Sequence, residues 1–187
     1  MIYKEIPIQV EGSDKTSRAQ FYILDTLPDE MKIQKRPIIL ICPGGGYHKV
    51  SYREGEPLAM HFLSLGYHAC VLQYSVSQEA FYPTQLLEVT ESVRQIHEHA
   101  KEWYIDTKKI VLAGASTGGH LAGNYCALLQ HRFFVGERGV YPGLTGTFKK
   151  KNKTYVEVLI NLRLSLELNK ENSHASSANR AILSNAS

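Results

Sequence analysis

The chain has 187 residues, of which 43% are apolar, and a formal net charge of +3. This length suits one domain with a buried core, and the apolar fraction is too high for a wholly disordered chain. There is no run of about 18 apolar residues and no apolar stretch at the N-terminus, so we expect neither a membrane span nor a secretory signal. The three cysteines, Cys42, Cys70 and Cys126, are far apart and predict neither a disulfide framework nor a metal site. A cytoplasmic, reduced setting is therefore expected.

The charge is unevenly distributed along the chain. Residues 148–187 carry seven lysines and arginines against three glutamates, and the remainder carries 14 basic and 15 acidic residues. We therefore predict a domain over residues 1–147, followed by a basic and then Asn- and Ser-rich segment over residues 148–187. The run at residues 149–153 is typical of a solvated loop, and without a basic face interleaved with aromatic residues it does not indicate nucleic-acid binding.

The first predicted elements are two short strands, at residues 6–10 and 20–24, joined as a hairpin across the turn signals of residues 12–14. The continuous apolar run at residues 37–42 predicts a strand buried on both faces of a sheet. A helix follows over residues 56–66. Its start is ambiguous, because residues 51–54 fit a capping box whereas Pro57 favours a later start.

The middle of the chain repeats this alternation. A strand is predicted at residues 69–74, an amphipathic helix over residues 83–104, a turn at residues 106–109 leading into a strand at 110–113, and a helix over residues 119–129. Buried strands that alternate with amphipathic helices predict an α/β fold with a mostly parallel sheet and flanking helices.

A G-x-S-x-G motif at residues 114–118 lies between a predicted strand and a predicted helix, with Ser116 at its centre. This context is the one required of a nucleophile elbow, in which a tight turn lifts a serine hydroxyl beside a helix N-terminus. The alternative is a glycine-rich turn in which Ser116 caps the helix.

A second glycine cluster, Gly44 to Gly46, follows the earlier buried strand. Glycines let main-chain N–H groups approach the oxyanion of an acyl-transfer intermediate. The alternatives are a flexible turn or a phosphate loop, but neither glycine cluster gives a complete phosphate-loop or dinucleotide-binding pattern.

Five stretches together resemble the α/β-hydrolase esterases of the acetyl-esterase and acetyl-xylan-esterase-like group. They are residues 41–47, 51–57, 71–76, 102–106 and 114–122, and the resemblance covers about residues 1–130. It implies an α/β-hydrolase fold and a serine carboxylesterase for small acyl esters such as acetyl esters, with an acetylated sugar as one candidate substrate. It further implies that Ser116 is the nucleophile and that the N–H groups of Gly45, Gly46 and Thr117 form the oxyanion hole.

The rest of the catalytic triad is harder to find. In this fold the acid and the histidine follow the serine, but no aspartate follows Asp106 and the later histidines are His120, His131 and His174. The resemblance places His120 in the support of the elbow. His174 is the candidate base, although its polar surroundings are more typical of a loop or tail.

The element count leads to a hypothesis about the C-terminal part. The family fold implies three further parallel strands after the elbow helix, and each β-α-β step takes roughly 30 residues. We therefore expect an incomplete or altered family member that lacks the last strands. The alternative to an esterase is a non-catalytic remnant, in which an uncovered sheet edge favours a homodimer.

Overall fold

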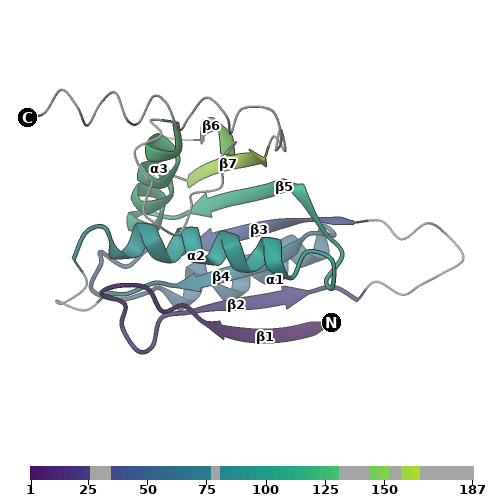
Figure 1. The fold of residues 1–187 in the computed structure, drawn as a ribbon, viewed down its shortest axis with the longest axis horizontal. Coiled ribbons are helices and arrows are strands. Elements are labelled where there is room, and N and C mark those ends of the chain that lie inside the picture. Colours follow the sequence, from purple (N-terminus) through teal and green to yellow (C-terminus); the bar gives the residue numbers. More distant parts are fainter. Residues whose placement is uncertain (26–34, 77–80, 131–143, 152–156, 165–187) are drawn as a thin grey trace, which may run out of the picture.

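The computed structural model describes residues 1–25, 35–76, 81–130, 144–151 and 157–164. Within them a seven-stranded mixed sheet runs in the order β1-β2-β4-β3-β5-β7-β6 (Figure 1). The strands are β1 (Ile2–Pro7), β2 (Arg18–Ile23), β3 (Arg36–Cys42), β4 (His68–Gln73), β5 (Ile105–Gly114), β6 (Leu144–Lys151) and β7 (Glu157–Leu164). The helices are the short 3₁₀ helix η1 (Tyr52–Glu54) and the α-helices α1 (Glu56–Ser64), α2 (Thr84–Glu98) and α3 (Thr117–Gln130).

The centre of the sheet is parallel, as the sequence predicts. β3 pairs in parallel with β4 on one side and with β5 on the other. The N-terminal hairpin β1–β2 is antiparallel and joins the sheet through an antiparallel pairing of β2 with β4. Both hairpin strands begin earlier than the apolar pattern indicated, because the polar residues of β1 pair along an exposed edge.

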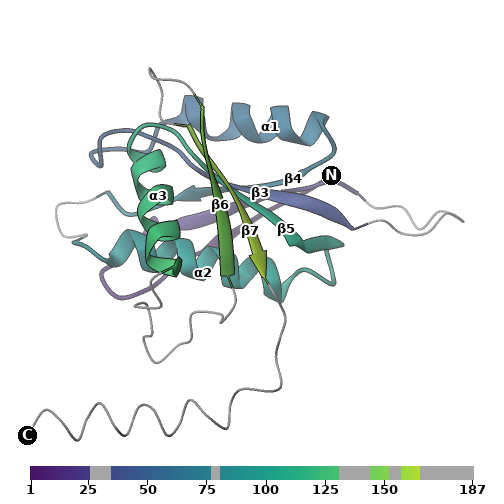
Figure 2. The ribbon, with the colours of Figure 1, turned by 90° about the horizontal axis from the view of Figure 1, so that it is seen from above.

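The core has two layers, one on each face of the sheet. Side chains of β3 point alternately to the two faces, so β3 contributes residues to both layers. Ile38 and Leu40 pack toward α2 and α3, whereas Ile39 and Ile41 pack toward α1. Figure 2 shows α1 on one side of the sheet and α2 on the other. β3 is therefore buried on both faces, which explains its uninterrupted apolar run.

Two predicted boundaries differ from the structure. The helix expected over residues 83–104 ends at Glu98, although Trp103 beyond it remains buried in the core at 2% exposure. The turn expected at residues 106–109 lies within β5, where an irregularity in the pairing between Arg36 and Ile38 absorbs the polar stretch.

The strands that follow α3 do not continue the parallel pattern. β7 pairs antiparallel with β5, and β6 pairs antiparallel with β7. Residues 149–151, expected in a loop, lie in β6. The described residues thus place an antiparallel hairpin beside β5, where the family fold implies a parallel strand. The expected division at residues 147 and 148 falls within β6 and stays a prediction.

The cysteines are free and buried, in agreement with the sequence analysis. Burial raises the pKa of the Cys126 thiol to about 12, and it raises the pKa of Cys42 and Cys70 as well. Among the described helices, none combines the length and apolar character needed to cross a bilayer.

Candidate active site

The candidate site forms because β3 and β5 are parallel neighbours that end at the same level. Cys42 and Gly114, the last residues of the two strands, are register partners. The segments that leave these strands therefore meet above the sheet, and the Ala115 N–H donates to the Cys42 carbonyl at 3.2 Å. This is where parallel α/β sheets place their ligand sites.

Ser116 lies at the tip of the turn between β5 and α3. Its φ is +51°, a left-handed conformation that L-residues other than glycine adopt rarely. The side chain is exposed, and no described residue forms a hydrogen bond with its hydroxyl. Backbone strain of this kind costs about 1–3 kcal/mol and persists where surrounding contacts enforce it.

The glycines on both sides of the serine are required by close backbone contacts. A Cβ on Gly114 would lie 2.2 Å from the Gly118 carbonyl oxygen. A Cβ on Gly118 would lie 1.9 Å from the carbonyl oxygen of Cys42, at the end of β3. The turn packs directly on the neighbouring strand, so the elbow geometry described for this motif is present and Ser116 is not a simple helix cap.

The glycine loop lies directly against the elbow. A Cβ on Gly44 would lie 3.0 Å from the Cβ of Ser116 and 2.7 Å from the Ala115 carbonyl oxygen. Gly45 and Gly46 have φ values of +137° and +70°. Only glycine tolerates the first of these, where a Cβ would collide with the Lys49 carbonyl at 1.9 Å.

The three expected oxyanion donors are not equivalent in this structure. The Gly46 N–H donates to the Thr117 hydroxyl at 3.1 Å, so it is engaged. The N–H groups of Gly45 and Thr117 have no hydrogen-bond partner among the described residues. The Thr117 N–H is also one of the unpaired groups at the start of α3, where the helix dipole favours an anion.

Three side chains that the sequence analysis did not select hold the loop in place. Glu54 accepts a hydrogen bond from the Gly44 N–H at 2.8 Å. The buried Tyr74 hydroxyl donates to the Pro43 carbonyl at 2.6 Å, and burial raises the pKa of this tyrosine well above its usual value. The third is Tyr47, whose hydroxyl contacts His120 on α3 and whose backbone has a positive φ of 61°.

The capping-box interpretation of residues 51–54 is therefore wrong. Ser51 makes no capping hydrogen bond, and Glu54 binds the glycine loop instead of a helix terminus. Tyr74 and Glu54 both lie in stretches that carried the family resemblance, and this was the signal that could have selected them.

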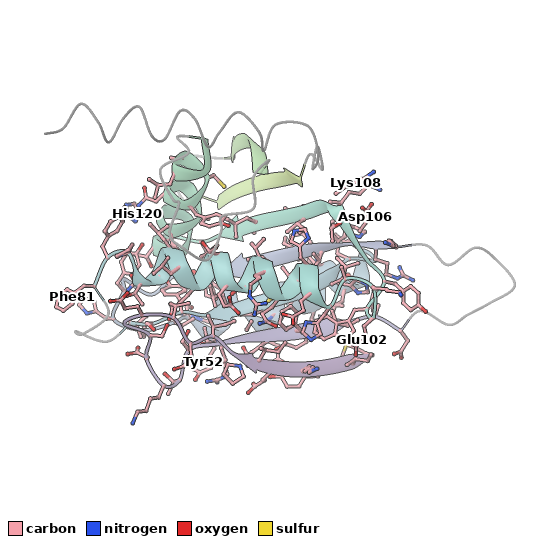
Figure 3. All side chains as sticks on the ribbon, in the orientation of Figure 1. Tyr52, Phe81, Glu102, Asp106, Lys108 and His120 are labelled. Atoms are coloured by element: carbon pink, nitrogen blue, oxygen red, sulfur yellow. The ribbon has the colours of Figure 1, made fainter. Side chains whose placement is uncertain are left out.

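The histidine nearest in sequence to Ser116 faces another partner. His120 lies one turn further along α3 (Figure 3). Its Nδ1 is 3.0 Å from the Tyr47 hydroxyl. The Asn124 side-chain nitrogen is 3.1 Å from its Nε2. The pair of Tyr47 and His120 thus joins the glycine loop to the elbow helix, in keeping with a supporting position for this histidine.

The expected base, His174, lies outside the described residues, as do His131 and three of the four later glutamates, Glu137, Glu167 and Glu171. Within the described part of the chain, no imidazole hydrogen-bonds the Ser116 hydroxyl. Nor do those residues contain a group of three histidine, cysteine or carboxylate side chains arranged to hold a metal ion.

The parallel core strands, the serine at a left-handed strand-to-helix turn and the adjacent glycine loop define an α/β hydrolase. Comparison with known proteins agrees with this class. The structure resembles MGS-M1, an α/β-hydrolase enzyme from a Medee basin deep-sea metagenome library, with a TM-score of 0.62 and 35% identity. The similarity covers 67% of this chain and 51% of that protein.

The chain belongs to the BD-FAE family, whose profile matches residues 24–183. It is thus a member of an α/β-hydrolase family that is related to esterases. The match runs past residue 130, where the motif resemblance ends.

Two further relatives carry names that bear on substrates. The acetyl ester-xyloside bifunctional hydrolase of Caldicellulosiruptor lactoaceticus is 28% identical, with a TM-score of 0.58 over 74% of this chain and 51% of that protein. Endo-1,4-beta-xylanase B of Butyrivibrio fibrisolvens is 38% identical over 93 residues, which are 48% of this chain and 15% of the xylanase. The chain thus spans about half the length of the two solved structures and a smaller share of the xylanase.

Proposed function

We propose that the chain hydrolyses small acyl esters through a covalent acyl-enzyme on Ser116. The observation that carries the proposal is the position of this serine. Its exposed hydroxyl projects from a strained turn, and the glycine loop with two unengaged N–H groups lies beside it.

In the proposed reaction, the Ser116 oxygen attacks the ester carbonyl carbon while a base takes the hydroxyl proton. The carbonyl oxygen becomes an oxyanion, which the N–H groups of Gly45 and Thr117 stabilise. Collapse of this intermediate breaks the bond to the alcohol, which leaves with the proton, and water then releases the acid from the serine. Loss of one oxyanion donor typically costs about 100- to 1000-fold in rate.

The base in this scheme is His174. The Gly46 N–H becomes a third oxyanion donor once its hydrogen bond to the Thr117 hydroxyl breaks. The substrate is an acetyl-type ester, and a sugar ester is favoured because two relatives are named for xylan or xyloside chemistry. No cofactor takes part in the proposed steps. A cytoplasmic location also stays a prediction.

The second candidate is a non-catalytic remnant of such an esterase. It is favoured by the engagement of His120 with Tyr47, and by the absence of any histidine bonded to Ser116 within the described residues. A homodimer is a prediction of this second candidate.

The decisive experiment is labelling with a fluorophosphonate probe, combined with hydrolysis of p-nitrophenyl acetate. Ser116→Ala should abolish both signals, and His174→Ala should remove most of the hydrolysis. Ser64→Ala is the matched control, since Ser64 is an exposed serine on α1 whose hydroxyl bonds the His61 carbonyl. Equal rates for the unmodified chain and Ser116→Ala would refute the esterase and leave the remnant.

A further inference from the structure

A second concave site lies away from the candidate nucleophile. It is a cavity of about 440 Å³ on the α1 side of the sheet, a volume that suits a small ligand. Its walls come from β1, β2, β4, η1 and α1, and we call it the tyrosine groove after Tyr3, Tyr22 and Tyr52. Neither the glycine loop nor the elbow contributes a lining residue.

The groove exists because the hairpin β1–β2 extends the sheet beyond the strands that α1 covers. α1 packs on β3 and β4, through residues that include Ala59 and Leu63. Tyr3 and Tyr22 are register partners on β1 and β2, so their side chains project from the same face of the hairpin. Their ring centroids are 5.0 Å apart with planes tilted by 53°.

The aromatic rings form an exposed wall and a buried floor. Tyr22 is only 4% exposed, but Tyr3 is 49% exposed and Tyr52, on η1, is 78% exposed. Tyr52 is labelled in Figure 3. Met60 of α1 lines the same cavity and is 37% exposed. Apolar surface gathered in a concavity indicates a ligand with an apolar face of its own.

Polar groups with fixed orientations lie among these rings. The Gln73 amide nitrogen donates to the Gln20 amide oxygen at 3.1 Å. The Gln20 amide nitrogen in turn donates to the Tyr3 hydroxyl at 3.0 Å and to Glu5 at 2.9 Å. This chain of bonds fixes which end of each amide is the donor, so polar groups of fixed orientation line the groove.

The charge of the groove selects among ligands. Glu56 lines it, and after burial, which is the larger cause, this carboxylate helps raise the pKa of Tyr22 above its usual value. Among the described residues no lysine or arginine lines the groove; Met1 also lines it, and its N-terminal ammonium is paired with Asp25. An anionic ligand is therefore disfavoured, and a purely apolar ligand would offer no hydrogen bond to the Glu56 carboxylate.

We propose that the tyrosine groove binds a neutral carbohydrate. A sugar ring presents C–H groups on its face, which pack on tyrosine rings, and hydroxyls at its rim, which both donate to carboxylates and pair with amides. Aromatic faces, oriented amides and a carboxylate together match that mixture.

The position of η1 connects the groove to the candidate active site. Tyr52 lines the groove, and Glu54, two residues later on the same turn, holds the Gly44 N–H of the glycine loop. One saccharide unit in the groove would therefore lie beside the element that supports the oxyanion loop. This link, unlike the binding itself, rests on the proposed function.

The test measures binding without requiring catalysis. In protein labelled with ¹³C at the methionine methyl groups, xylotetraose should shift the Met60 signal saturably, with the signal assigned by Met60→Leu. Tyr52→Ala should weaken this binding at least tenfold, a loss of 1.4 kcal/mol. Tyr52 is so exposed that its truncation should leave the thermal midpoint unchanged. Phe81→Ala is the matched control, because Phe81 is 73% exposed and does not line the groove.

Two further arms separate the outcomes. A tetragalacturonate, which is an anionic sugar chain, should bind more weakly than xylotetraose, and Glu56→Gln should reduce that difference. Ser116→Ala should leave xylotetraose binding intact, so loss of esterase activity and loss of groove binding are distinguishable. No saturable shift, an affinity unchanged by Tyr52→Ala, or a preference for an extended peptide along the β1 edge would overturn the proposal.

Discussion

The contact between the elbow and β3 gives the sharpest test of the site geometry. A Cβ on Gly118 would lie 1.9 Å from the Cys42 carbonyl oxygen and 2.5 Å from that of Pro43. An ordinary contact begins at 3.4 Å, so the first distance is 1.5 Å too short. Both oxygens belong to the backbone at the end of a central strand, and neither can rotate away. Gly118→Ala must therefore push the start of α3 away from β3.

The cost can be estimated from this displacement. Overpacking typically costs about 1–3 kcal/mol, and a rigid backbone neighbour places Gly118→Ala at or above the upper end. For a chain of this size each kcal/mol lowers the thermal midpoint by about 2–4 °C. A shift of about 1 Å between Ser116 and the glycine loop should also slow acylation roughly 100-fold.

Thermal unfolding and the rate of fluorophosphonate labelling measure the two effects separately. Gly66→Ala is the matched control, because Gly66 has a φ of +85° and its added Cβ would meet only the Arg36 side chain at 3.5 Å. It should lose about 1–2 kcal/mol from left-handed strain and keep full labelling. The reasoning is refuted if Gly118→Ala unfolds at the same temperature as Gly66→Ala and labels at the original rate.

Three other predictions concern polar groups. Glu88 is fully buried and accepts hydrogen bonds from the Ser13 hydroxyl at 2.8 Å and from the Ser75 N–H and hydroxyl. Glu88→Ala removes the acceptor of these groups, and each buried donor left without a partner costs about 1–3 kcal/mol. A denaturant titration should therefore show a free energy of unfolding that is lower by several kcal/mol. Burial first, and then Arg36, lowers the pKa of His68 to about 4, below the unfolded value of about 6.5. Stability from the neutral imidazole is thus complete above pH 6.5 and lost toward pH 4, and His68→Asn should flatten this dependence in unfolding curves at several pH values. Glu54→Ala should lower kcat/KM for p-nitrophenyl acetate by releasing the glycine loop, whereas Glu54→Gln, which keeps an acceptor, should retain most of it; equal values for both variants would contradict this role.

Features set by local sequence patterns were predicted correctly, whereas features set by contacts between distant segments were not. The apolar run of β3 and the alternation of strands and helices were enough to predict a parallel core, because a strand that is buried on both faces is apolar at nearly every position. The ends of α2 and β5 were misplaced. Trp103 keeps the helical spacing after the helix has ended, and the polar residues 106–109 of β5 lie at an irregularity in its pairing with β3. The hairpin β6–β7 depends on pairing with β5, which no local pattern specifies.

The sequence by itself determined the elements of the candidate site: a serine between two glycines at a strand-to-helix junction, and a glycine run after a neighbouring strand. Only the tertiary structure decided how they meet. The pairing of Cys42 with Gly114 brings the two loops together, and Glu54 and Tyr74 fix the glycine loop from distant points of the chain. The tyrosine groove has the same origin, because Tyr3, Tyr22 and Tyr52 become neighbours only when the hairpin joins the sheet beside η1. Local spacing can be read along a chain, but contacts between separate elements depend on the packing of the whole sheet.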